Sequence, residues 1–147
     1  MVLLQIFSQL LEAFAKGDPI SSLLFLLVME VFTRMLLVAI SAGLLSGFSV
    51  DRRNLAIINV SHLLLVDDTI IFCDNDCEQM VNLRCILIWF EAVSGLRVDN
   101  LAKSSILPVG QVDNIQFLAG VLGCTVDSFP AYYLGLPLGA KFKDKSI

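Results

Sequence analysis

The chain has 147 residues, which is the length of one domain or of part of one. Its 14 acidic and 10 basic side chains give a net charge of −4, and charged residues make up only 16% of the sequence against 56% for apolar ones, so the composition excludes a disordered chain and a basic nucleic-acid-binding tail. So short a chain has more apolar residues than one small domain comfortably buries, and we therefore expect a membrane protein, a tight oligomer or a piece of a larger protein.

The first third of the chain is predicted to contain two helices. Residues 2–15 have the pattern of a short amphipathic helix. No basic region and no small-residue cleavage site accompany it, so we expect the protein to be intracellular and not secreted. Pro19 stands near the first position of a second helix. The apolar stretch 20–45 of that helix contains two charges, Glu30 and Arg34, spaced to lie on one face.

Short apolar runs alternate with helical patterns through the rest of the chain. Residues 62–65 and 69–72 flank two aspartates and predict a β-hairpin with these aspartates at its tip. A helix is predicted over 77–93, after a capping signal at 74–76. Its apolar positions at helical spacing include Met80, Val81, Leu83, Ile86, Leu87 and Phe90. The other predicted segments are strands at 48–50, 56–60, 96–98 and 105–109, a polar loop at 99–105, a weak helix at 113–122 and a Pro/Gly-rich segment at 132–140. This alternation places the fold in the α/β (α+β) class.

The cysteines and the single histidine form no metal or disulfide pattern. No C-x-x-C pair occurs, and the spacings fit neither a zinc site nor a disulfide framework. Nothing in the sequence supports a Ser/His/Asp triad around His62. We expect four buried thiols in a reducing compartment, at Cys73, Cys77, Cys85 and Cys124.

The adjacent pair Asp67 and Asp68 is the sharpest candidate for chemistry. Two neighbouring carboxylates repel each other unless a cation compensates them, and a hairpin tip that presents both suits a hard divalent ion. Two such ions can stabilise the attacking and leaving oxygens of phosphoryl transfer. A polar turn is the plainer interpretation, and the dipeptide alone favours it.

Four blocks of the sequence occur in the order found in one family of polymerases. In chain order they are Gly17 to Ser21 for a Q-G-D-P-L-S motif, Leu65 to Asp68 for an [F/Y]-x-D-D hairpin, Ser94 to Lys103 for S-G-L-K-[VI]-N-x-x-K, and Tyr133 to Gly139 for Y-L-G-x-P-[LI]-G. Residues 17–147 therefore resemble the reverse transcriptase domain of plant LINE-type (non-LTR) retrotransposons, whereas residues 1–16 do not match it.

The resemblance implies a partial polymerase palm with the start of a thumb, in which an antiparallel Asp-Asp hairpin packs on helices. Such a palm takes a nucleic acid template–primer and a dNTP. Asp67 and Asp68 would be two of three catalytic carboxylates that hold Mg²⁺, and Lys103 would be a catalytic cation near the triphosphate. The other residues that the resemblance places against substrate are Gly17, Asp18, Pro19, Val66, Tyr133, Leu134 and Gly135.

Plainer alternatives exist for these positions and stay open. The segment 17–19 is also an ordinary helix start, Lys103 is also a solvated loop lysine, and 133–139 is also a turn between palm and thumb. The sequence departs from the family pattern in four places: Ala15-Lys16 with Ser22 around the first block, Leu65 in place of an aromatic side chain, Val66 in place of alanine, and the extra residue Asp99.

The family's first catalytic aspartate is what we expect this chain to lack. It lies upstream of the G-D-P block in the family, whereas Glu12 is the single acid among residues 1–16 here. We expect the fingers and the first palm strand with its aspartate to be absent. A two-metal site with two of three carboxylates is under-charged, so we expect the chain by itself not to polymerise DNA.

Two further classes of protein remain as alternatives. The stretch 20–45 is long enough to cross a bilayer, although Glu30 and Arg34 near its middle make insertion costly, and no membrane association is expected. A non-catalytic interaction module derived from the palm is the other alternative. Segments 23–29 and 36–45 are expected to be partly uncovered, and such apolar surface favours self-association.

Overall fold

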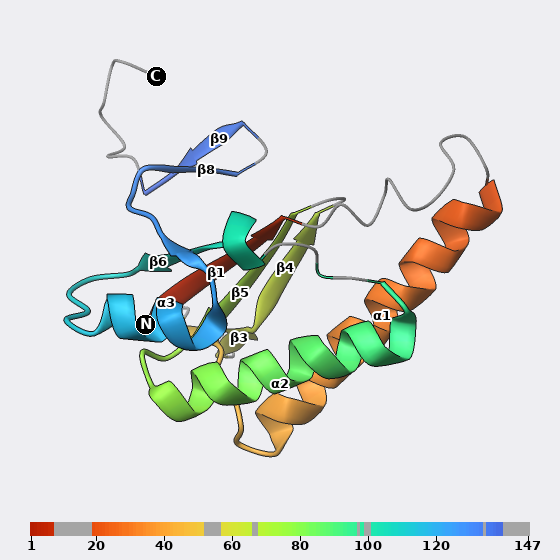
Figure 1. Cartoon of the computed structure of the whole chain (residues 1–147), viewed down its shortest axis with the longest axis horizontal. Helices are drawn as coiled ribbons and strands as arrows, with labels where there is room; N and C mark the ends of the chain where they lie inside the picture. The colour runs from red at the N-terminus through yellow and green to blue at the C-terminus, as the bar shows by residue number, and fades with distance from the viewer. Residues whose placement is uncertain are drawn as a thin grey trace.

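A five-stranded sheet forms the centre of the molecule (Figure 1). The computed structural model describes residues 1–7, 19–51, 57–65, 68–96, 98, 101–133 and 135–139. The strands run in the order β4–β5–β1–β6–β7, with bounds β1 Val2–Phe7, β4 His62–Leu65, β5 Asp68–Cys73, β6 Ser105–Pro108 and β7 Thr125–Val126. Only the β6–β7 pair is parallel among these described strands. The predicted α+β class is confirmed at this level.

The central strand β1 lies where the sequence predicted a helix. It pairs antiparallel with β5 from Val2↔Cys73 to Phe7↔Asp68 and antiparallel with β6 on its other side. The predicted helix at 2–15 is therefore wrong over residues 2–7. A short apolar run cannot be assigned to helix or strand from its own periodicity, and here pairing with two distant strands decides the outcome.

Two interleaved β-α-β units generate the sheet order. β1 and β4 are connected through α1 (Pro19–Ser41) and lie on either side of β5. β5 and β6 are connected through α2 (Cys77–Ser94) and lie on either side of β1. This order, with β1 antiparallel to both of its neighbours, is the ferredoxin-like split β-α-β arrangement. A small hairpin of β2 (Phe48–Val50) and β3 (Ile58–Val60) is inserted before β4, as predicted.

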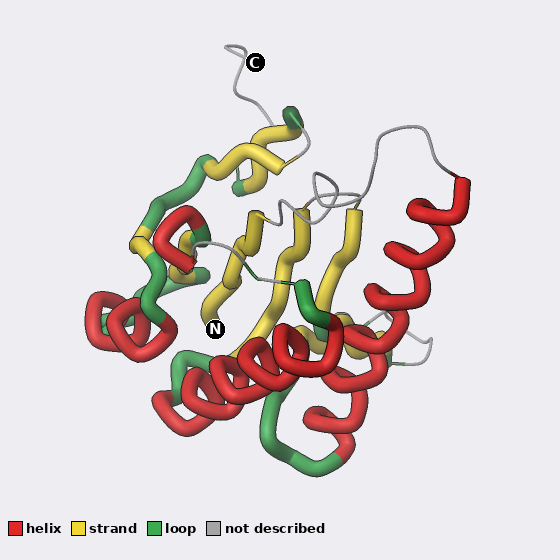
Figure 2. The backbone as a smooth tube through the Cα atoms, turned by 45° about the vertical axis from the view of Figure 1, so that its right-hand side comes forward, coloured by secondary structure: helices red, strands yellow, loops and turns green. Residues whose placement is uncertain are grey.

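The helices cover one face of the sheet, as Figure 2 shows. α1 begins at Pro19, the position that proline favours. Asp76 caps α2 by accepting a hydrogen bond from the Gln79 amide, and Gly95 ends it in the left-handed conformation. The main core joins these helices and α3 (Ile115–Leu122) to the strands. Phe32 and Phe90 meet in this core with ring centroids 4.8 Å apart.

A smaller apolar cluster lies on the opposite, open face of the sheet. The hairpin of β8 (Ala131–Tyr133) and β9 (Leu136–Leu138) packs there on side chains from three strands. These are Leu3, Ile70 and Leu107. The Pro/Gly-rich segment predicted at 132–140 thus contains a hairpin.

Some local predictions are wrong. The strand predicted at 96–98 is not found at Leu96 or Val98. The loop predicted at 99–105 contains a 3₁₀ helix, η2, at Leu101–Lys103. Cys85, predicted to be buried, is exposed, and so is Val81. Both errors lie on α2, whose sequence is apolar enough that periodicity alone does not separate its buried face from its outer face.

α1 is apolar over its whole length but only partly buried. By length and composition it could cross a membrane, with a mean hydropathy of 2.4 in its most apolar window, of which 22% is buried. The buried residues are Met29, Phe32, Leu36 and Ala39. Segment 23–29 is largely uncovered, as predicted, whereas 36–45 is mixed, since Leu36 and Leu45 are buried and Leu37 and Val38 are exposed.

Candidate functional site

Four strand ends meet at one end of the sheet, which we call the hairpin end. β1 finishes there at Phe7, β4 finishes at Leu65 and β5 begins at Asp68, because Phe7 and Leu65 are both register partners of Asp68. β6 begins nearby, since Ser105 pairs with Gln5 of β1. The split topology therefore gathers at this end several segments that are far apart in the sequence.

Asp68 is the first residue of β5, so its backbone is held between two neighbouring strands. The pairing of Leu65 with Asp68 leaves a two-residue connection, Val66 and Asp67, which lies outside the described residues. The predicted hairpin is confirmed. The prediction that both aspartates sit at its tip is confirmed only in part, because Asp68 already belongs to the strand.

β1 brings no carboxylate to the hairpin end. Its sequence is VLLQIF, and the residue paired with Asp68 is Phe7. Among the described residues, no three His, Cys, Asp or Glu side chains lie close enough together to hold a metal ion. The strand that pairs with β5 beside the aspartate hairpin is thus β1, whose own sequence carries no acid.

Lys103 lies at the same end of the sheet as Asp68. It is the last residue of η2, which directly precedes β6 and contacts β1. The buried Ser104 fixes this turn, since its carbonyl accepts hydrogen bonds from the Thr125 amide (3.0 Å) and hydroxyl (3.1 Å). The Lys103 side chain is exposed, so a lysine lies near the hairpin end on a segment whose backbone is held by hydrogen bonds.

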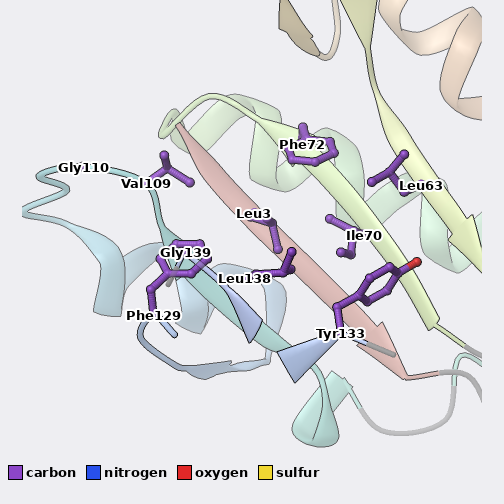
Figure 3. Close-up of a pocket in the computed structure, with 10 residues that line it drawn as sticks. All are labelled: Leu3, Leu63, Ile70, Phe72, Val109, Gly110, Phe129, Tyr133, Leu138 and Gly139. Carbon is purple, nitrogen blue, oxygen red and sulfur yellow. The ribbon is translucent and has the colours of Figure 1, made fainter. Parts of the chain in front are cut away.

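The β8–β9 hairpin brings Tyr133 to the open face of the sheet. Tyr133 is buried and lines a cavity of about 410 Å³ together with Leu63 and Ile70 (Figure 3). Gln5 ties the hairpin to the central strand, because its buried side-chain amide donates to the Tyr132 carbonyl at 3.3 Å. The cavity wall is apolar, and it places the hairpin beside β5, which begins at Asp68.

Of the remaining predicted site residues, the structure describes Pro19 and Gly135. Gly17, Asp18 and Leu134 lie outside the described residues. Pro19 is exposed at the start of α1, and this end of the helix lies away from the β4–β5 hairpin in both views (Figures 1 and 2). Gly135 forms the turn of the β8–β9 hairpin, with a φ of 76° that favours glycine.

Sequence reasoning missed two polar features. Gln5 is the one polar residue of β1, and that single departure from an apolar strand was the signal available. His62 bridges β4 and α1, with Nδ1 2.6 Å from the Ser61 hydroxyl and Nε2 3.2 Å from the Thr33 hydroxyl. Burial lowers the pKa of His62, so the imidazole is held in its neutral form as a structural bridge.

The thiols of two cysteines are held in their protonated form. Burial raises the pKa of Cys73 to about 12, and burial raises the pKa of Cys124 to about 11. A thiol with a raised pKa is a poor nucleophile and a poor metal ligand at neutral pH. These cysteines are therefore packing residues.

Comparison with protein-family models, with curated proteins and with solved structures finds no match. The geometry of the hairpin end is therefore the basis for a functional proposal. At this end the backbone of Asp68 begins β5, Asp67 precedes it in the sequence, and the segment bearing Lys103 lies nearby.

Proposed function

We propose that this chain is a palm-like piece of a LINE-type reverse transcriptase that retains a weak site for a divalent cation and a nucleoside triphosphate. The sequence blocks that resemble this family supply Asp67, Asp68 and Lys103. The observation that carries the proposal is the sheet order, because it brings Asp68 and the segment bearing Lys103 to one end of the sheet although they are 35 positions apart in the chain.

The chemistry of these residues matches that role. Asp67 and Asp68 are oxygen ligands of the type that Mg²⁺ takes, and Lys103 supplies a positive charge for the phosphates of the nucleotide. When bound, the cation would supply charge neutralisation at those phosphates. A nucleic acid primer would approach this end of the sheet beside β5, next to the β8–β9 hairpin.

Catalysis by the chain alone is not part of the proposal. Nucleotidyl transfer by two metal ions needs ligands enough to hold both ions a few ångströms apart. β1 occupies the position beside the aspartate hairpin and contributes only apolar side chains and one glutamine. We therefore infer that the ancestral activity, RNA-templated DNA synthesis, is absent from this chain.

Calorimetric titration with Mn²⁺ tests the proposal. We expect weak binding by the natural chain, loss of binding in Asp67→Asn and Asp68→Asn, and unchanged binding in the matched control Asp51→Asn, which removes an exposed carboxylate elsewhere. Phe7→Asp sets a third carboxylate opposite Asp68 and is expected to tighten Mn²⁺ binding about tenfold or more, as added carboxylate ligands do.

Two results would contradict the proposal. Equal Mn²⁺ affinity in the natural chain and in both aspartate variants would show that the hairpin holds no cation. Metal-dependent primer extension by the natural chain that disappears in Asp67→Asn would show instead that the site is complete and active.

A further inference from the structure

The outer face of α1 carries a regularly spaced apolar stripe. Its members recur at alternating steps of four and three residues: Ile20, Leu24, Leu27, Val31, Arg34 and Val38. This is the a/d spacing that lets two helices pack side by side as a coiled coil. The five apolar members are 41% to 65% exposed. The core uses the opposite face of α1, through Phe32 and Leu36 among others, so the stripe points away from the core that the structure describes.

The exposed apolar area is the amount that a stable helix pair covers. A fully covered Leu, Ile or Val side chain contributes on the order of 100 Å², so the stripe, its flanking Leu23 and Leu37, and Trp89 of α2 expose on the order of 400 Å². Stable interfaces bury about 800 Å² per partner, of which somewhat more than half is apolar. An apolar area of this size equals the largest patch on a typical monomeric protein, and such a patch often marks an interaction site.

A groove beside the stripe is a suitable binding site for a second helix. It has a volume of about 380 Å³ and runs between α1 and α2, lined by Val31 and Val38 on one side and by Ile86 and Trp89 on the other. The N-terminal turns of α1 extend past α2 (Figures 1 and 2), and they present Ile20 and Leu27. Each molecule thus has both a groove and a projecting apolar helix end.

The charges on α1 select an orientation. Glu30 and Arg34 form an ion pair of 2.8 Å and lie near the middle of the helix. In a parallel pair of identical helices, each charge would face its own copy, which is unfavourable. In an antiparallel pair, Glu30 of one copy lies near Arg34 of the other, and the reverse pair forms by symmetry.

We propose that two copies of this chain associate through α1, in antiparallel orientation, with the N-terminal half of each α1 in the α1–α2 groove of the other. This inference goes beyond the nucleotide-binding role and does not depend on it. It makes the dimer a property of the fold, present with or without divalent cations.

Sedimentation velocity over a wide range of protein concentrations tests the association. We expect a monomer–dimer equilibrium for the natural chain. Leu27→Glu, at a 63% exposed stripe position, should weaken it by at least tenfold. Phe117→Glu is the matched control, because Phe117 is 60% exposed on α3, outside the stripe, and the substitution should leave the equilibrium unchanged.

Disulfide trapping tests the orientation. In a Cys85→Ser background, which removes the exposed thiol, Val31→Cys lies near the two-fold axis of an antiparallel pair and should cross-link to its own copy. Leu24→Cys should not cross-link in that pair but would do so in a parallel one. This positive signal does not depend on a variant that weakens the protein.

Three outcomes would overturn the proposal. The first is a natural chain that remains monomeric at all concentrations. The second is an equal reduction of association by Leu27→Glu and Phe117→Glu, which would indicate nonspecific aggregation. The third is a monomer that floats with phosphatidylcholine vesicles unless Leu27→Glu is present, because lipid would then be what covers the stripe.

Discussion

His62 is expected to contribute to the loss of stability in mild acid. Burial lowers the pKa of His62 in the folded state from its usual value of 6.5. Just below pH 6.5, His62 is therefore protonated in the unfolded chain and still neutral in the folded chain. Stability is therefore complete above about pH 6.5 and falls as the pH decreases towards the lower pKa of the folded state. We expect His62→Gln to lose less stability than the natural chain between about pH 7.5 and pH 5.5, as measured by urea unfolding. An equal loss in both proteins would contradict this assignment.

Gly139, directly after β9, packs closely against the ring of Phe129. A Cβ there would lie 2.6 Å from the Phe129 ring, and φ is 75°. We expect Gly139→Ala to destabilise the protein by about 2–4 kcal/mol, through backbone strain and overpacking together. Gly135→Ala is the control, because its φ is 76° but no atom lies within 4 Å of the added carbon. It should cost only about 1 kcal/mol, and equal thermal shifts in the two variants would exclude the clash with Phe129.

At the scale of elements, Gln5 connects the β8–β9 hairpin to the central strand. Its hydrogen bond to the Tyr132 carbonyl is made by a buried side chain, so Gln5→Leu should destabilise the docked hairpin by about 1 kcal/mol. Hydrogen exchange should show faster exchange of the β8–β9 amides with little change in α2. Gln111→Leu, which alters an exposed glutamine, should leave the hairpin amides unchanged.

The elements that could be predicted are those defined by nearby residues. The β4–β5 hairpin, α2 with its Asp76 cap and Gly95 end, and the start of α1 at Pro19 all follow from local signals. β1 could not be predicted, because its strand conformation comes from pairing with residues 68–73 and 105–108. The relative position of the candidate site residues is likewise set by pairing between segments that are distant in the sequence.

Within that site, sequence alone identified Asp68 and Lys103 as separate candidates through a family resemblance. It could not place them at one end of a sheet, since that requires the strand order. It also could not show that β1, rather than a strand bearing an acid, lies beside the aspartate hairpin.

For the whole molecule, association through α1 predicts that thermal stability depends on protein concentration. Binding of one folded copy by another stabilises both by mass action. We expect the Tm of the natural chain to rise with concentration, and the Tm of Leu27→Glu to stay constant. Differential scanning calorimetry at several concentrations measures this, and a constant Tm for both proteins would indicate that the folded monomer is the only stable species.

The central place of β1 has a consequence for how the chain is made. β1 leaves the ribosome before either of its neighbours exists, since β5 ends at residue 73 and β6 at residue 108. Until β5 and β6 are both synthesised, the apolar strand β1 has no backbone hydrogen-bonding partners. Sheets built from such distant strand pairs form slowly. Assembly of the central sheet therefore requires residues 68–73 and 105–108, and until they are present β1 is an unpaired apolar segment of the kind that chaperones protect.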